Sequence, residues 1–271
     1  MVSLNFYNMI ALICVLVIGI PHGGFDAAIA RSRGWPQSFF YFITFHILYL
    51  LLALFVIIVW FFYPLLFLAI FLTLSGLHFG LSDIKHHQSM NLIPIIAHGG
   101  LIPIIIPYYN KVEVGTFFTI LVGPHNSLTL LQWVDYLIIP WFFVMIIYAW
   151  KMISTKQYLY DYMSLLLLCF LALILPPIIT FSIYFCLFHT PRHINLTLKE
   201  FSIIDKRRSI IEACIYSLVA ILGMLYFYTY VLTDYTISER SLLIVFVGLA
   251  ALTVPHMILV DYLFHQYNDD E

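Results

Sequence analysis

Histidine is the reactive residue type that stands out in this sequence. It recurs within segments that are otherwise almost entirely apolar, where an ionisable side chain is costly to bury. Five short motifs carry it: PHGGFD at 21–26, LHFG at 77–80, AHGG at 97–100, FHTPRH at 188–193 and PHM at 255–257. Neutral imidazole is a common ligand of iron, copper and zinc, and several imidazoles on one cation would offset each other's cost of burial. The motifs therefore indicate a metal site assembled from distant parts of the chain.

Four of these histidines form the predicted ligand set and the predicted catalytic residues, namely His22, His78, His189 and His193. His189 and His193 are four residues apart, which places both on one helix face if the helix continues. Pro191 removes a backbone donor, so this reading needs a kink or a break that still presents both rings.

Other polar residues beside the motifs are candidates for orienting a ligand or contacting a substrate, namely Asp26, Asp83, His98, Arg192 and His256. Asp26 lies one turn after His22 and could orient its ring. Each candidate has a structural alternative, since a single buried histidine often bonds a neighbouring helix and a charge can mark a helix end. The glycines that flank the motifs equally allow close helix packing or space for a substrate.

Composition identifies the elements that must position these residues. Apolar residues make up 63% of the 271 residues and charged residues 10%, against about 25% charged in ordinary globular proteins. A net charge of −2 provides no basic patch, so nucleic acid is not an expected partner. The sequence therefore predicts an all-α polytopic membrane protein that forms a single transmembrane catalytic domain over residues 1–271.

Nine segments meet or approach the length of about 20 residues that a spanning helix needs: 4–30, 37–62, 64–82, 92–109, 134–150, 158–175, 178–194, 209–231 and 241–264. The prolines of the fourth segment, and Pro176-Pro177 between the sixth and seventh, make eight or nine spans the prediction. The first segment is expected to be a retained span, because no Lys or Arg precedes its long apolar run.

Charge placement predicts the orientation in the membrane. With the N-terminus outside, nine positive residues fall in the inner loops (Arg31, Arg33, Lys85, Lys151, Lys156, Lys199, Lys206, Arg207 and Arg208) and two in the outer loops (Lys111 and Arg240). Positive residues favour the cytoplasmic side, so the C-terminus is expected inside. At a rise of about 1.5 Å per helical residue, the predicted ligand histidines then lie roughly 10–15 Å from the cytoplasmic helix ends, at a similar depth in the membrane.

The motifs, in this order and along nearly the whole chain, resemble the Brp/Blh family of membrane β-carotene 15,15'-dioxygenases. The resemblance implies cleavage of the central double bond of β-carotene with O2 into two all-trans-retinal molecules, in the plasma (inner) membrane. It further implies iron(II) on His22, His78, His189 and His193, and a functional link to a retinal-binding rhodopsin. A buried site would take such a polyene directly from the lipid bilayer.

Three other readings stay open. A membrane di-iron lipid desaturase or hydroxylase would use several HxxxH and HxxHH boxes, whereas this chain has one HxxxH and no HxxHH. A non-enzymatic carotenoid or retinal binder is the second, although the six lysines lie in loops or at helix ends, which argues against a rhodopsin with its buried Schiff-base lysine. A bis-histidine haem protein is the third.

Overall fold

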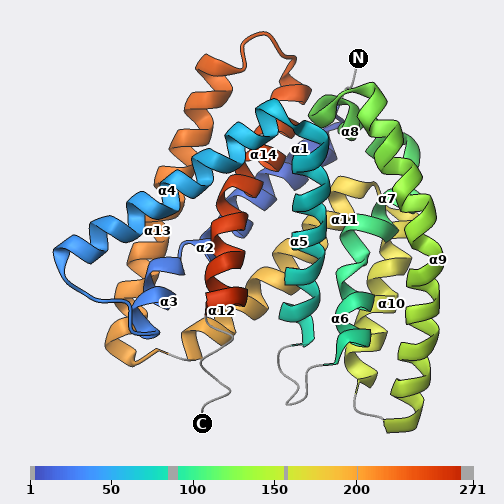
Figure 1. The fold of residues 1–271 in the computed structure, drawn as a ribbon, viewed down its shortest axis with the longest axis horizontal. Helices are drawn as coiled ribbons and strands as arrows, with labels where there is room; N and C mark the ends of the chain where they lie inside the picture. Colours follow the sequence, from blue (N-terminus) through green and yellow to red (C-terminus); the bar gives the residue numbers. More distant parts are fainter. Residues whose placement is uncertain (1–3, 85–90, 156–157, 200, 264–271) are drawn as a thin grey trace. The chain divides into compact units, whose positions relative to one another are not determined.

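Helices account for all the regular structure in the computed structural model, which describes residues 4–84, 91–155, 158–199 and 201–263 (Figure 1). The chain divides into two compact units. Unit 1 comprises Met1–Tyr63 and Phe185–Glu271, and unit 2 comprises Pro64–Tyr184. The predicted all-α membrane fold is confirmed, while the single catalytic domain over 1–271 stays a prediction.

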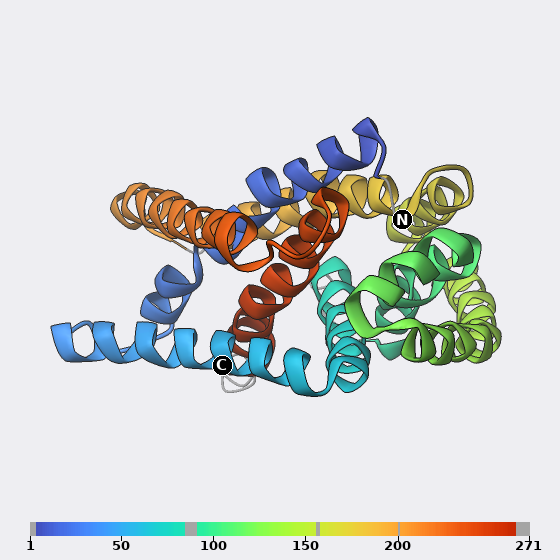
Figure 2. The same cartoon turned by 90° about the horizontal axis from the view of Figure 1, so that it is seen from above.

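Unit 1 contains both ends of the chain. Its N-terminal part is α1 (Phe6–Cys14), η1 (Val15–Gly19), α2 (Ile20–Gly23), α3 (Asp26–Ser32) and α4 (Phe39–Phe62), where η denotes a π-helical segment. Its C-terminal part is α12 (Thr190–Lys199), α13 (Ile203–Tyr226), η4 (Phe227–Val231), α14 (Ile237–Met257) and η5 (Ile258–Leu263). η3 (Tyr184–His189) leads into this part. Figure 2 shows α14 crossing against α4, so the two ends of the chain pack together within this unit.

Unit 2 is the continuous middle of the chain. It contains α5 (Pro64–Ile84), α6 (Leu92–Gly99), η2 (Leu101–Ile105), α7 (Ile106–Tyr109), α8 (Lys111–Val122), α9 (Pro124–Thr155), α10 (Leu159–Ile174) and α11 (Pro177–Ile183). Three of its helices begin with proline (Pro64, Pro124 and Pro177), at the position where the missing N–H has no intrahelical partner to lose.

Seven helices of the described ranges are long and apolar enough to cross a membrane: Phe6–Ser32, Phe39–Phe62, Pro64–Ile84, Leu92–Tyr109, Pro124–Thr155, Asp205–Val231 and Ile237–Asp261. They coincide with seven of the nine predicted spans. The predicted span 158–175 corresponds to the shorter α10, and 178–194 is divided among α11, η3 and α12. The inside–outside orientation stays a prediction. Two of its loop charges, Lys85 and Lys156, and the last residue of the ninth predicted span, Phe264, lie outside the described residues.

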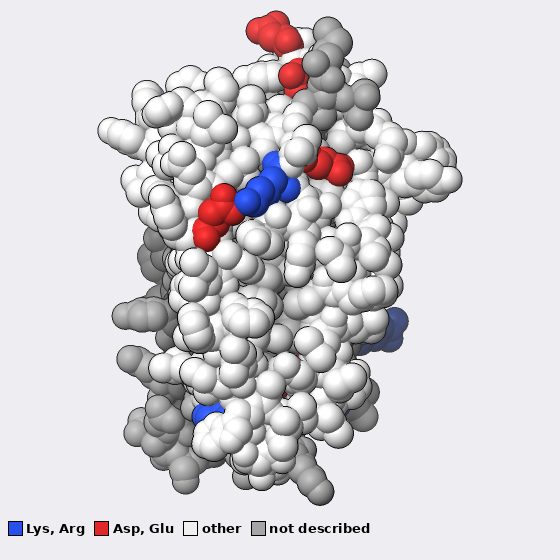
Figure 3. All heavy atoms as spheres, turned by 90° about the vertical axis from the view of Figure 1, so that its right-hand side faces the viewer, with Lys and Arg blue, Asp and Glu red and all other residues white. Residues whose placement is uncertain are grey.

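The surface is apolar, as a bilayer requires. α4 and α13 expose most of their large apolar side chains, and Figure 3 shows a face on which Lys, Arg, Asp and Glu are few. Such a surface would be unfavourable in water and is typical of helices that contact lipid.

Close helix packing explains most of the glycines beside the histidine motifs. A Cβ atom on Gly80 of α5 would lie 2.1 Å from the Ile95 carbonyl oxygen of α6, and one on Gly76 would lie 2.8 Å from that of Gly99. One on Gly24 would lie 2.7 Å from the Ala213 carbonyl oxygen of α13. Gly23 is the exception, because a Cβ there would meet nothing within 4 Å.

Candidate functional site

Unit 1 brings four histidines from distant parts of the chain into ring contact. The centroid of the His22 ring lies 5.4 Å from that of His189, 5.5 Å from that of His193 and 4.9 Å from that of His256. The rings of His193 and His256 are 5.0 Å apart, and those of His189 and His193 are 6.1 Å apart and nearly parallel. All four are buried, with at most 7% of any residue exposed. The structure thus groups three of the four predicted ligands and adds His256.

Helix irregularities surround this histidine cluster. η1 directly precedes the short α2 that carries His22, His189 is the last residue of η3, and η5 begins two residues after His256. A π-helical turn contains an extra residue and redirects the side chains that follow, and such turns are frequent at functional sites. Pro191 is the second residue of α12, and helix continues into α12 from η3 without a break. The irregularity beside this proline is therefore the π-helical η3, and His189 and His193 lie on one continuous helical run.

Asp26 is buried beside the cluster and binds His256. The His256 Nδ1 lies 2.6 Å from Asp26 Oδ1, and the Tyr49 hydroxyl donates to Asp26 Oδ2 at 2.8 Å. The same hydroxyl lies 3.0 Å from the Leu252 carbonyl oxygen. We expected Asp26 to orient His22, whereas the structure places its two carboxylate oxygens on His256 and Tyr49.

The hydrogen bonds of two cluster residues fix which ring nitrogen carries a proton. The Nδ1 of His22 contacts the Gly19 carbonyl oxygen, and that of His256 contacts the Asp26 carboxylate. Carbonyl and carboxylate oxygens accept, so each Nδ1 carries a proton, and in the neutral imidazole each Nε2 then keeps its lone pair. Metal-binding histidines characteristically hold their second nitrogen in this way.

Ring spacing tests whether a metal ion fits between these residues. Imidazoles that share one ion at ~2.1 Å per nitrogen place their ring centroids roughly 4.6–6.5 Å apart, depending on the angle at the metal. The measured separations of 4.9–6.1 Å fall within that range. In the present side-chain positions, no group of three or more His, Cys, Asp and Glu among the described residues forms a complete metal site. The ring spacing nevertheless fits a shared ion.

Unit 2 holds three of the other predicted residues, namely His78, Asp83 and His98. His78 is buried on α5. Asp83 Oδ2 accepts from His98 Nδ1 and from the Tyr184 hydroxyl, both at 3.1 Å, and the Tyr148 hydroxyl lies 3.4 Å from His98 Nε2. This is a second buried histidine–carboxylate pair. Its geometry agrees with the expectation that Asp83 orients a histidine, and the role of His78 as a ligand stays a prediction.

Three tyrosines of these networks escaped the sequence analysis, namely Tyr49, Tyr148 and Tyr184. With 19 tyrosines in a chain of apolar helices, no local pattern distinguishes a buried hydroxyl from one at the membrane surface. Arg192 lies on α12 between cluster residues and is partly exposed, so its predicted contact with substrate or carboxylate stays a prediction.

The chain is similar to known proteins over nearly its whole length. Residues 13–264 match the profile of the family described as beta-carotene 15,15'-dioxygenase. The chain is also 35% identical, over 276 aligned residues, to a protein of uncultured marine bacterium 66A03 named beta-carotene 15,15'-dioxygenase, covering 98% of this chain and 97% of that one. No solved structure matches the chain.

Proposed function

The chain belongs to the beta-carotene 15,15'-dioxygenase family, and on that basis we propose that it cleaves β-carotene at a single iron(II) ion held by histidines. The reaction would consume O2 and release two all-trans-retinal molecules. We further propose that it acts in the plasma (inner) membrane, where its substrate dissolves, and that its product supplies a retinal-binding rhodopsin.

The observation that carries the metal proposal is the buried histidine cluster. We assign His22, His189 and His193 as ligands from their ring contacts, and His78 from the family resemblance. We assign His256 to the same site, because its ring contacts two of these histidines and its Nδ1 is held by a carboxylate. Iron(II) bound by neutral imidazoles would supply the chemistry that activates O2.

The charge balance of unit 1 supports a cation at this place. Asp26 is buried, and its hydrogen-bond partners among the described residues are the Tyr49 hydroxyl and the His256 ring. A buried carboxylate is costly unless a positive charge lies nearby. A metal ion on the Nε2 side of His256 would provide that charge through the imidazole ring.

The protein's own contribution would be positioning and exclusion of water. Its histidines would hold the ion near the midpoint of the polyene, and the apolar helices would keep water away from it. The described lysines Lys111, Lys151, Lys199 and Lys206 all lie within the terminal turns of helices. Their placement argues against a retinal Schiff base inside the bundle.

The test is expression in bacterial cells that accumulate β-carotene, followed by chromatography of the extracted pigments. We expect β-carotene to fall and retinal to appear in proportion. His22→Ala should abolish the change, whereas His125→Ala, at an exposed residue near the start of α9, should not. Elemental analysis of the purified protein should give one iron per chain. Two would favour the di-iron desaturase or hydroxylase, and unchanged β-carotene in cells that contain the protein would contradict the substrate.

A further inference from the structure

A cavity of about 370 Å³ lies in unit 1 beside the histidine cluster. Its walls come from α2 and α3, from α4 and from α13, with Leu252 of α14. It adjoins the site at Gly23, which follows His22, and at Asp26, which binds His256 and Tyr49. Its lining is mostly apolar, and its volume is within the range of about 300–1,000 Å³ typical of small-molecule pockets.

Gly23 provides part of this space. A Cβ on Gly24 would meet the backbone of Ala213, so that glycine is required by the packing of α2 against α13. A Cβ on Gly23 would meet nothing within 4 Å, although the residue lines the cavity. Close packing therefore offers no reason for a glycine at this position. The open space beside His22 is a reason.

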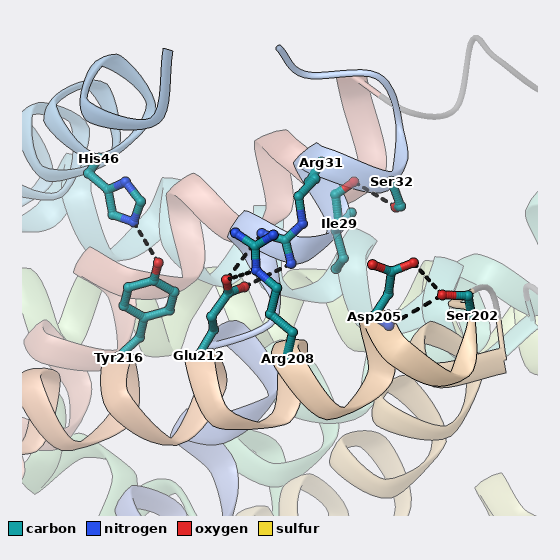
Figure 4. A network of polar contacts seen from close by, with 9 residues as sticks. All are labelled: Ile29, Arg31, Ser32, His46, Ser202, Asp205, Arg208, Glu212 and Tyr216. Atoms are coloured by element: carbon teal, nitrogen blue, oxygen red, sulfur yellow. Dashed lines mark hydrogen bonds and ion pairs between the residues drawn. The ribbon is translucent and has the colours of Figure 1, made fainter. Parts of the chain in front are cut away.

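One wall of the cavity carries a polar pair. His46 of α4 and Tyr216 of α13 both line it, and the Tyr216 hydroxyl lies 2.9 Å from His46 Nε2 (Figure 4). His46 Nδ1 donates to the Phe42 carbonyl oxygen at 2.7 Å, so Nε2 is the acceptor and the tyrosine hydroxyl donates to it. The Tyr216 oxygen keeps a lone pair that can accept a hydrogen bond, but its proton is already used.

We propose that this cavity holds one ring-terminated half of the carotenoid. Tyr216, in the cavity wall, would distinguish ring substituents by whether they can donate a hydrogen bond to it. The proposal rests on the proposed function, because cleavage at the midpoint requires each half of the substrate to extend away from the cluster. The cavity adjoins the cluster at Gly23 and Asp26, is mostly apolar, and lies between α4 and α13, which expose most of their large apolar side chains. A hydroxyl on the ring could donate to Tyr216, whereas a keto group, which only accepts, would find no donor there.

The experiment compares two phenylalanine substitutions in the purified full-length protein. Gly23→Phe fills the cavity, and Gly223→Phe places the same side chain on α13 where the residue is exposed and a Cβ meets nothing. Each protein is reconstituted in phospholipid nanodiscs with β-carotene, and the pigment that remains bound is measured. Overfilling costs about 1–3 kcal/mol, so we expect Gly23→Phe to bind roughly 5- to 150-fold more weakly than wild type and Gly223→Phe to bind like wild type.

The readouts separate this proposal from the proposed function. If wild type binds β-carotene without cleaving it, the proposed function fails, and the binding comparison still tests the cavity. Equal binding by wild type and Gly23→Phe would overturn the cavity proposal even where cleavage is normal, and would show that a lipid acyl chain or nothing occupies it. Absence of binding to wild type would overturn it as well.

Two further variants keep the test decisive if Gly23→Phe does not fold. Ala220→Phe fills the cavity from α13 and should weaken binding in the same way. Tyr216→Phe removes the acceptor, so it should reduce binding of a carotenoid with hydroxylated rings several-fold relative to β-carotene. If Tyr216→Phe leaves the ratio of the two binding affinities unchanged, Tyr216 has no part in the proposal. If the wild-type protein binds a carotenoid with keto rings more tightly than one with hydroxylated rings, the assignment of donor and acceptor is wrong.

Discussion

Asp26 provides the sharpest test of the histidine cluster, because its effect on a metal ion should pass through one hydrogen bond. Asp26→Asn keeps an oxygen that can accept from His256 Nδ1 but removes the charge. A hydrogen bond to a charged group contributes about 1.5–3 kcal/mol and a neutral one about 0.5–1.5 kcal/mol. The difference of about 1–1.5 kcal/mol predicts iron(II) affinity roughly 5- to 13-fold weaker. Asp26→Ala also releases the Tyr49 hydroxyl, and its loss should approach the upper end of the 10–100-fold range for removing such a partner.

The assay is anaerobic competition for iron(II) between the purified protein and a chelator of known affinity, which needs no turnover. Asp135→Asn is the matched control, since that carboxylate pairs with Lys111 at an exposed place on α9. A double-mutant cycle with His256→Ala separates position from general stability. If Asp26 acts through His256, the double variant should bind iron no more weakly than His256→Ala alone. Wild-type affinity in both Asp26 variants, or fully additive losses in the cycle, would refute this reasoning.

Three further outcomes are expected. His78→Ala should abolish retinal formation in β-carotene-accumulating cells and lower bound iron, and normal values of both would remove it from the ligand set. Gly24→Ala should lower the free energy of unfolding by about 1–3 kcal/mol in a thermal or denaturant melt, because the added Cβ would lie 2.7 Å from the Ala213 carbonyl oxygen. An unchanged melt would show that α13 can shift to make room. Glu212→Gln should lower the free energy of unfolding by about 1–3 kcal/mol, because this mostly buried carboxylate accepts from both Arg31 and Arg208. An unchanged melt would show that the ion pairs do not help to hold α13 against α3.

The spans were predictable because a bilayer imposes a physical length on every helix that crosses it. Seven predicted spans therefore coincide with helices of the structure. The region 177–199 was not predictable in the same way. Helix runs without interruption from Pro177 to Lys199 but contains the π-helical η3 between α11 and α12, and hydropathy does not indicate where such a turn falls.

The misplaced role of Asp26 has a specific cause. Asp26 lies four positions after His22, and that spacing implies a shared face only within one continuous helix. Here α2 ends at Gly23 and α3 begins at Asp26, so the periodicity does not cross the gap. The carboxylate instead meets His256, which is 230 positions away and had no sequence signal connecting it to Asp26.

The two histidine–carboxylate pairs have the same arrangement in different surroundings, which helps to assign their roles. Asp26 and Asp83 each bind a histidine Nδ1 and a tyrosine hydroxyl. The Nε2 of His98 faces another hydroxyl, that of Tyr148, so hydrogen bonding alone accounts for its burial. The His256 ring instead contacts two further imidazoles, and neutral imidazoles that pack together gain most when a cation lies between them. The contrast favours a structural role for the pair in unit 2 and a metal-binding role for the pair in unit 1.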